Sequence, residues 1–322
     1  MAELELDDLA SRLKPAGVTD LSPLAGGASS LTYAGRLGEH RVVVKVAPPG
    51  VAPVLHRDVL RQARLLRALS STPVPVPEVL WDDAGAPPEV PPLFVMPFLD
   101  GTSLEPLFDL DDDGTPPAVV SERMSNAART MADLHSIDPA TLVLGDEPHV
   151  GPADEIQRWC RLLDTVDPRL VPGWQPVAES LRSSMPGQFG ITIVHGDFRL
   201  GNLLAVGEAI KAIIDWEIWS LGDPRVDVGW FLANANPETY RRPTRYASVL
   251  PSVTDLASAY QSALGREVPD LDWFQALASF KSAATWSLIV KHNRRRSSPD
   301  TDIEAMAPVL PHLLDRAEAL LA

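Results

Sequence analysis

The chain has 322 residues, 45% of them apolar, which is enough for a substantial core in two modest domains or two lobes. Its formal net charge of −15 disfavours a nucleic-acid binder, because displacing counterions needs a surplus of Lys and Arg. A single cysteine excludes an intramolecular disulfide framework. No signal-peptide pattern or 18-residue apolar run is present, so we expect a cytoplasmic protein without a membrane span.

The first hundred residues predict an antiparallel sheet. Strands are expected over Val18–Leu24, Leu31–Leu37 and Arg41–Val46, and the glycine-rich sequence GGASS lies between the first two. Lys45 lies inside the apolar run VVVKVA, where a charged side chain is costly unless a partner is present. This lysine is therefore a candidate site residue.

A helix is expected over Val54–Leu69, with Gln62 on the same face as its apolar residues. The later run LFVMPFLDG predicts a strand followed by a loop. Asp109–Gly114 begins like a calcium-binding loop, but Val120 stands where a bidentate Glu is required, so we expect an exposed acidic insertion. Ser121 is the expected cap of the next helix.

The stretch ITIVHGDFRLGNLLAVGEAIKAIIDWE, at 191–217, carries a recognisable chemistry. Buried strands are predicted over Ile191–Val194 and Ile210–Ile214, and carboxylates follow each of them. A third strand, Leu203–Val206, folds back on the second as a hairpin. If Glu208 and Ala209 are its loop residues, Asn202 pairs with Asp215.

Asn202 and Asp215 would then project to one face with Cβ atoms about 5 Å apart, and their oxygens are hard ligands suited to Mg²⁺. The order His195, Asp197, Asn202 and then Asp215 also matches the kinase arrangement. There, one Asp accepts the proton of the substrate hydroxyl, while the Asn and the second Asp hold the metal on the phosphates.

The remaining sequence predicts helices over residues 153–185 and 252–321. The segments with apolar residues at helical spacing are Leu256–Leu264, Trp273–Lys291 and Ile303–Leu321. The basic run KHNRRR, at 291–296, follows the long helix and is interpreted as its solvated end, with contact to an anionic substrate as the alternative.

With HGDFRLGN and IDWE, the sequence resembles the aminoglycoside phosphotransferase family, the small-molecule branch of the protein-kinase-like fold. The resemblance runs from about Leu24 to Trp230. It implies an α+β fold of two lobes: an N-terminal nucleotide-binding lobe, residues 1–99, with an antiparallel sheet and one main helix, and a larger, mainly helical catalytic and substrate-binding lobe, residues 100–322. The signature is closest to the phosphotransferase-like domains associated with acyl-CoA dehydrogenases.

The resemblance also implies roles in nucleotide binding. Gly26, Gly27 and Ser29 would form the turn over the phosphates, and Lys45 would contact the α and β phosphates. The Glu that normally pairs with this lysine is replaced by Gln62. Three explanations stay open: Gln62 orients Lys45, Asp58 substitutes one turn earlier, or nucleotide binding is weakened.

Adenine is expected against the backbone of the strand that contains Met96, whose side chain would supply apolar wall. Pro97 has no N–H, so Phe98 is the expected backbone donor to the base. Arg199 occupies the position of the kinase catalytic-loop lysine and would either neutralise the γ-phosphoryl group or form a structural salt bridge. Asp227 is expected to tie backbone segments together.

The expected function is therefore transfer of a phosphoryl group from ATP or GTP to a hydroxyl of an aminoglycoside-like or other small molecule. Asp197 would be the base, and Asn202 and Asp215 would hold Mg²⁺. The acidic composition suits a cationic acceptor but is equally explained as a solubility feature. The alternatives are a hydroxyacyl-CoA-type acceptor and a nucleotide-binding pseudokinase, and the oligomeric state is left open.

Overall fold

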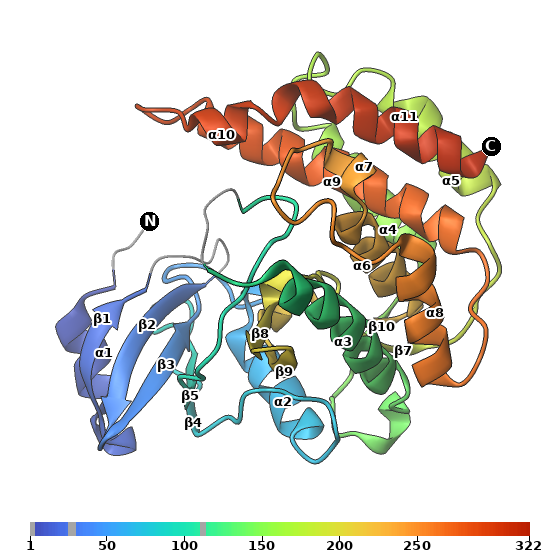
Figure 1. Ribbon diagram of the computed structural model, residues 1–322. Coiled ribbons are helices and arrows are strands. Elements are labelled where there is room, and N and C mark those ends of the chain that lie inside the picture. Colours follow the sequence, from blue (N-terminus) through green and yellow to red (C-terminus); the bar gives the residue numbers. More distant parts are fainter. Residues whose placement is uncertain (1–3, 25–29, 110–113) are drawn as a thin grey trace. The chain divides into compact units, whose positions relative to one another are not determined.

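The computed structural model describes residues 4–24, 30–109 and 114–322 (Figure 1). The predicted phosphate-turn residues Gly26, Gly27 and Ser29 lie outside the described residues. The chain divides into two compact units, each built from separate segments. The first unit comprises Met1–Ser103, Ala140–Asp146 and Asn202–Trp219. The second unit comprises Leu104–Pro139, Glu147–Gly201 and Ser220–Ala322.

The first unit contains a five-stranded antiparallel sheet in the order β1-β2-β3-β5-β4. The strands are β1 (Val18–Pro23), β2 (Leu31–Leu37), β3 (His40–Val46), β4 (Trp81–Asp83) and β5 (Leu93–Pro97). In β3, Val42, Val44 and Val46 are buried in one core cluster with two leucines of helix α1 (Leu6–Leu13). Because side chains alternate along a strand, Lys45 points to the opposite face.

Helix α2 (Val59–Leu69) begins five residues later than predicted, because Asp58 is its N-cap. The Asp58 carboxylate accepts hydrogen bonds from the backbone N–H groups of Leu60, at 2.9 Å, and Arg61, at 3.1 Å. The preceding residues, Leu55–Arg57, form a separate 3-10 turn. The Asp58 carboxylate therefore satisfies backbone N–H groups of the first turn that have no partner within the helix. The suggestion that it substitutes as the partner of Lys45 is wrong.

The predicted hairpin is present as β8 (Leu203–Val206) and β9 (Ala209–Ile213), but its predicted register is wrong. The loop residues are Gly207 and Glu208, and Gly207 takes a positive φ of 57°, which glycine adopts at little cost. An irregularity between Leu204 and Ala205 shifts the pairing once more. The N–H of Ile214 donates to the carbonyl of Asn202 at 2.9 Å, so Asn202 is not paired with Asp215.

The second unit contains a short sheet and most of the helices. The sheet has the order β6-β10-β7, from strands His149–Val150, Ser220–Gly222 and Thr192–Val194. The helices are α3 (Pro117–His135), α4 (Pro152–Leu163), α5 (Trp174–Ser183), α6 (Arg225–Ala235), α7 (Pro237–Tyr240), α8 (Val253–Leu264), α9 (Leu271–Asn293), α10 (Thr301–Glu304) and α11 (Leu310–Leu321).

Prolines account for two differences from the predicted helices. Helix α3 starts at Pro117, four residues before the predicted cap Ser121, because proline is well suited to a first helical turn. The single helix predicted to 321 is divided into α10, a 3-10 turn at Ala307–Val309, and α11, and prolines stand at the start of the latter two. No helix in the described part of the chain has the length and apolar character needed to cross a bilayer.

Helix α9 runs through the core of the second unit and packs against α4, α6 and α11 (Figure 1). All residues of α6 are buried. A Cβ added at Gly229 of α6 would overlap the backbone of Phe274 in α9, so the glycine permits the two helices to approach closely. This contact holds α6, which carries Asp227, against α9.

Candidate active site

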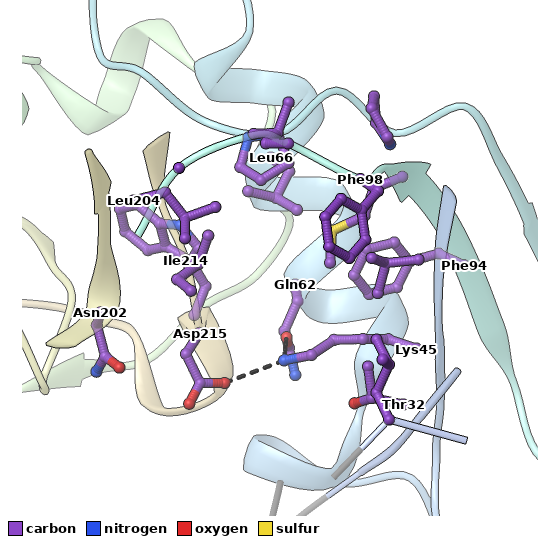
Figure 2. A pocket seen from close by; sticks show the side chains of 18 residues that line it. Thr32, Lys45, Gln62, Leu66, Phe94, Phe98, Asn202, Leu204, Ile214 and Asp215 are labelled. Atoms are coloured by element: carbon purple, nitrogen blue, oxygen red, sulfur yellow. Dashed lines mark hydrogen bonds and ion pairs between the residues drawn. The ribbon is translucent and has the colours of Figure 1, made fainter. Parts of the chain in front are cut away.

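The first unit encloses a cavity of about 330 Å³, and every residue that lines it belongs to that unit (Figure 2). One part of its wall is apolar and the other carries polar side chains. Its apolar lining includes Leu24, Val43, Leu66, Phe94, Met96, Phe98, Leu204 and Ile214. The polar side chains are Thr32, Lys45, Gln62, Asn202 and Asp215. An apolar cavity with a few convergent polar groups is typical of a small-molecule site.

Lys45 is the cation of this cavity. Its Nζ lies 3.0 Å from Oδ1 of Asp215 and 3.5 Å from Oε1 of Gln62 (Figure 2). The second distance is at the outer limit of a hydrogen bond, whereas the first is a close ion pair. Among the explanations left open by the sequence, the structure therefore shows weak contact with Gln62 and a stronger contact with Asp215.

Asn202 and Asp215 both line the cavity although they are not paired across the hairpin. Asp215 lies two residues after the end of β9 and is in the left-handed region, with φ 64° and ψ 55°, an uncommon conformation for a residue with a Cβ. Its carboxylate and the Asn202 amide oxygen are hard donors of the kind that bind Mg²⁺. Two protein ligands also suit a Mg²⁺ that completes its coordination with phosphates and water, so these residues fit the metal implied by the resemblance.

The predicted role of Phe98 as the donor to adenine is wrong. Its backbone N–H donates to the carbonyl of Arg41 at 2.9 Å and so continues the β3–β5 ladder. The Leu80 N–H donates to the Val95 carbonyl at 2.8 Å, on the other edge of β5. Hydrogen-bonding directions alternate along a strand. The Pro97 carbonyl and the Leu99 N–H therefore point away from β3, and both residues line the cavity, as does Met96.

A second group of candidate residues lies in the second unit, around the loop after β7. The Asp227 carboxylate accepts hydrogen bonds from the backbone N–H groups of His195, at 2.6 Å, and Gly196, at 2.8 Å. The prediction that Asp227 ties backbone together is confirmed. Burial raises the pKa of Asp227, but the hydrogen bond and charge of His135 and the contacts of His195 outweigh it and hold the pKa below its ordinary value.

This loop carries Asp197, whose carboxylate is oriented by two side chains. The indole Nε1 of Trp230 donates to its Oδ1 at 2.8 Å, and Nε of Arg199 lies 3.2 Å from its Oδ2. The Asp197 side chain is still 24% exposed. A carboxylate that is held in place and partly open can accept a proton from a bound hydroxyl.

Arg199 forms ion pairs with both Asp197 and Glu105. This contact matches the salt-bridge alternative for Arg199, while its role towards a phosphoryl group stays a prediction. The side chains of Arg199 and Glu105 are half-buried. A Cβ added at Gly201 would overlap the Glu105 carboxylate. The loop is therefore packed closely around the arginine.

Sequence reasoning missed Trp230 and Lys281 as site residues. Nζ of Lys281, from α9, donates to the carbonyl of Gly196 and lies 3.7 Å from the centroid of the Trp230 ring. Burial lowers the pKa of Lys281 to about 8, although the charges of Asp197 and Glu155 oppose the shift. One signal was available: a single lysine in the apolar helix sequence FQALASFKSAATW parallels Lys45 in its strand.

The family profile described as "Phosphotransferase enzyme family" matches residues 20–277. Among curated proteins, the chain is 26% identical to acyl-CoA dehydrogenase family member 10 of Mus musculus, over 86% of the chain and 27% of that protein. It is also 26% identical to acyl-CoA dehydrogenase family member 11 of Homo sapiens, over 80% of the chain and 34% of that protein. The chain thus spans about a quarter to a third of the length of these relatives.

Solved structures show the same fold. A protein of Ralstonia eutropha JMP134, named a candidate aminoglycoside phosphotransferase, matches with a TM-score of 0.76 and 21% identity over 98% of this chain and 99% of that one. A thermostable mutant of aminoglycoside phosphotransferase APH(4)-Ia, in a ternary complex with ADP and hygromycin B, matches with a TM-score of 0.63 and 17% identity over 96% of this chain and 98% of that one. The predicted α+β, protein-kinase-like fold is confirmed.

Proposed function

Because the chain belongs to the phosphotransferase enzyme family, we propose that it transfers the γ-phosphoryl group of ATP to a hydroxyl of a small molecule. The observation that carries the proposal is the cavity of the first unit, where Lys45, Asn202 and Asp215 converge beside an apolar wall. A lysine, an amide oxygen and a carboxylate are the groups that kinases use to hold nucleotide phosphates and their metal.

In this proposal the apolar wall, with Met96 and Phe94, takes the adenine, and the Pro97 carbonyl and Leu99 N–H meet its polar edge. Lys45 binds the α and β phosphates. Asn202 and Asp215 would hold Mg²⁺, which would neutralise charge on the phosphates when bound. Binding of ADP together with hygromycin B by APH(4)-Ia, a protein of similar fold, supports a nucleotide and a hydroxyl compound as ligands.

Asp197 is the proposed base. Its carboxylate accepts the proton of the acceptor hydroxyl while the acceptor oxygen bonds to the γ-phosphorus and the bond to the β–γ bridging oxygen breaks, which releases ADP. The Trp230 and Arg199 hydrogen bonds fix the carboxylate, and the Asp227 contacts fix the backbone that carries it. Positioning and charge neutralisation would supply most of the catalysis.

Two classes of acceptor are proposed. A hydroxyacyl thioester is favoured by the sequence similarity to acyl-CoA dehydrogenase family members, which covers at least 80% of the chain. A cationic, aminoglycoside-like acceptor is the second candidate, and the net charge of −15 favours it. A nucleotide-binding pseudokinase, suggested by Gln62, is less well supported because Asp197, Asn202 and Asp215 are all present.

Calorimetry with Mg-ATP tests the division of roles. Asp215→Asn is expected to lower Mg-ATP affinity at least tenfold, since it removes a charged metal ligand. Asp197→Asn is expected to leave affinity within about twofold of wild type, because the base acts on the acceptor. Equal losses of nucleotide affinity in the two variants would contradict the assignment.

A further inference from the structure

Lys281 is a buried cation that takes no direct part in the proposed phosphoryl transfer. It lies in the middle of α9, within a continuous run of buried residues, and is 5% exposed. Burying an ammonium group is costly unless hydrogen bonds and charges compensate it. The contacts that compensate Lys281 therefore indicate what the residue does.

Two of these contacts are with groups that orient Asp197: the backbone of the preceding residue and the indole ring that donates a hydrogen bond to its carboxylate. The Lys281 ammonium donates to the carbonyl of Gly196, the residue directly before Asp197. It also lies 3.7 Å from the ring centroid of Trp230, a cation–π distance, and the same indole donates its N–H to Asp197 at 2.8 Å. One cation thus contacts both the backbone and the side chain that orient the proposed base.

The surrounding charges favour the protonated lysine. Asp197 from the loop, Glu155 from α4 and Asp227 from α6 stabilise the ammonium, and Arg158 from α4 opposes it. A second ring, that of Trp159, lies with its centroid 5.5 Å from Nζ. The ammonium is therefore held by acidic groups and aromatic rings from several elements of one unit.

We infer that Lys281 is a positioning residue for the proposed phosphotransfer: its ammonium holds the Gly196 carbonyl and the Trp230 ring, and through them it orients Asp197 towards the acceptor. The inference rests on the proposed function, in which Asp197 is the base. Loss of the Lys281 proton removes the cation from the Trp230 ring and from the neighbourhood of the Asp197 carboxylate. Since burial lowers the pKa of Lys281 to about 8, activity should decline above this pH.

The kinetic test compares Lys281→Met with Lys281→Arg. The Met variant should lose on the order of tenfold or more in kcat at pH 7, with the KM for Mg-ATP little changed, because the base is misoriented while the nucleotide cavity is intact. The wild-type decline in kcat near pH 8 should be absent from both variants, because the Met side chain does not ionise and the Arg side chain stays charged. The Arg variant should retain more activity than the Met variant.

Lys291→Met is the matched control, because Lys291 lies on the same helix but is only half-buried and donates to the Thr165 carbonyl. It should keep the wild-type kcat and the decline near pH 8. Wild-type kcat and an unchanged pH profile in Lys281→Met would overturn the inference. A loss of kcat that leaves the alkaline decline in place would also overturn it, since this is the signature of a general packing defect.

A second measurement does not depend on turnover. The indole N–H signal of Trp230, identified by its absence from Trp230→Phe, is followed by NMR against pH. In wild type it should shift with a midpoint near 8, as the adjacent ammonium loses its proton, and in Lys281→Arg it should not. An indole signal that is flat in wild type overturns the inference. If the signal titrates but no acceptor is phosphorylated, the coupling of Lys281 to Trp230 stands and the proposed function fails instead.

Discussion

Lys45 has two neighbours of unequal strength, and this bears on the replacement of the usual glutamate by Gln62. The Lys45 ammonium is the charged donor in both contacts, but only Asp215 adds an opposite charge, and only that contact is well within hydrogen-bond distance. The 3.0 Å contact of Lys45 with Asp215 therefore outweighs its 3.5 Å contact with Gln62. In the proposed function, where Mg²⁺ would engage Asp215, Gln62 would be the neighbour that keeps Lys45 oriented.

Substitutions at Gln62 test this arrangement. Gln62→Glu is expected to preserve or raise Mg-ATP affinity, because it adds a charge beside Lys45. Gln62→Leu is expected to lower the affinity about fivefold, or about 1 kcal/mol, which is less than usual for a hydrogen bond from a charged donor because the 3.5 Å contact is long. Calorimetric titration measures both.

Asp58 offers a matched control, since it caps α2, whereas Lys45 contacts Gln62 and Asp215. Asp58→Ala should lower the free energy of unfolding by about 1 kcal/mol and leave nucleotide affinity unchanged. If Asp58→Ala weakens Mg-ATP binding more than Gln62→Leu does, the assigned partner is wrong.

Asp227 predicts a pH-dependent stability. Its pKa in the folded protein is below the ordinary value, so the stabilisation by its carboxylate is present above the unfolded-state pKa, near 4, and is lost as the pH falls below it. Asp227→Asn should lower the free energy of unfolding by roughly 2–3 kcal/mol at pH 7, because it disturbs two buried backbone hydrogen bonds. The deficit should narrow as the pH falls below 4, towards the lower pKa of the folded state. Urea unfolding of both proteins at several pH values measures this.

Asp167→Asn is the control for this series, since Asp167 is an acid on the surface paired with Arg169. Exposed ion pairs contribute little, so its unfolding curves should follow those of wild type. A deficit for Asp227→Asn that stays constant as the pH falls from 7 to well below the unfolded-state pKa would mean that ionisation of Asp227 is not what stabilises the loop.

At the residue scale, the sequence predicted which side chains line the cavity better than it predicted their hydrogen bonds. Lys45, Gln62, Met96, Asn202 and Asp215 were all expected at one site, and all of them line one cavity. Lys45 and Asp215 could be found because a lysine in an apolar strand and a carboxylate after a buried strand are locally unfavourable choices. Gln62 and Met96 were expected there only because of the family resemblance. The backbone N–H of Phe98 was predicted to bind adenine, but it donates to the Arg41 carbonyl of the neighbouring strand. The direction of a backbone N–H depends on pairing with a strand that is distant in sequence, so it could not be predicted locally.

At the scale of elements, the hairpin shows how a small local choice alters a predicted site. Its two strands were predicted correctly, but the turn is centred one residue earlier because Gly207 takes the positive φ, and an irregularity follows at Leu204 and Ala205. A slip of one residue normally moves a side chain to the other face of a strand. Asp215 reaches the cavity with Asn202 nevertheless, because it lies beyond β9 in a left-handed conformation.

The contact between α6 and α9 could not be predicted from periodicity, because both helices are apolar around most of their circumference. It depends on Gly229, where an added Cβ would overlap the backbone of Phe274. Gly229→Ala should therefore lower the free energy of unfolding by roughly 1–3 kcal/mol, as expected for overpacking of a core. Chemical denaturation measures the change.

Gly190→Ala is the matched control, since an added Cβ there meets no atom within 4 Å and the residue has no positive φ. It should unfold at the wild-type denaturant concentration. Equal stability of Gly229→Ala and Gly190→Ala would show that α6 can move away from α9 at little cost.

At the scale of the whole molecule, the two compact units contribute different parts of the proposed chemistry. The cavity with Lys45, Asn202 and Asp215 is formed within the first unit, and the Asp197 loop is held within the second. The chain passes from one to the other between Gly201 and Asn202, inside the motif itself. The proposed base and the proposed metal ligands therefore lie on opposite sides of this division along the sequence.

The net charge of −15 bears on the acceptor. If the acceptor is a hydroxyacyl-CoA, its phosphates are repelled by the acidic protein, and its KM should fall as salt is raised, because the Debye length shortens to about 10 Å at 0.1 M. Initial rates at several ionic strengths, with the KM for ATP as the internal reference, measure this. A KM for the acceptor that rises steeply with salt would favour the cationic class instead.

The central claim is tested most directly by transfer of label from [γ-³²P]ATP to a panel of hydroxyl compounds that includes hydroxyacyl-CoA thioesters and aminoglycosides, with Asp197→Asn run in parallel. We expect wild-type protein to label at least one acceptor in a Mg²⁺-dependent reaction. Asp197→Asn should reduce this rate by about 10²-fold or more while it still binds Mg-ATP, because the base is lost and the nucleotide cavity is not. Undiminished labelling by Asp197→Asn would contradict its role as base, and Mg-ATP binding without labelling of any compound would favour the pseudokinase alternative over phosphotransfer.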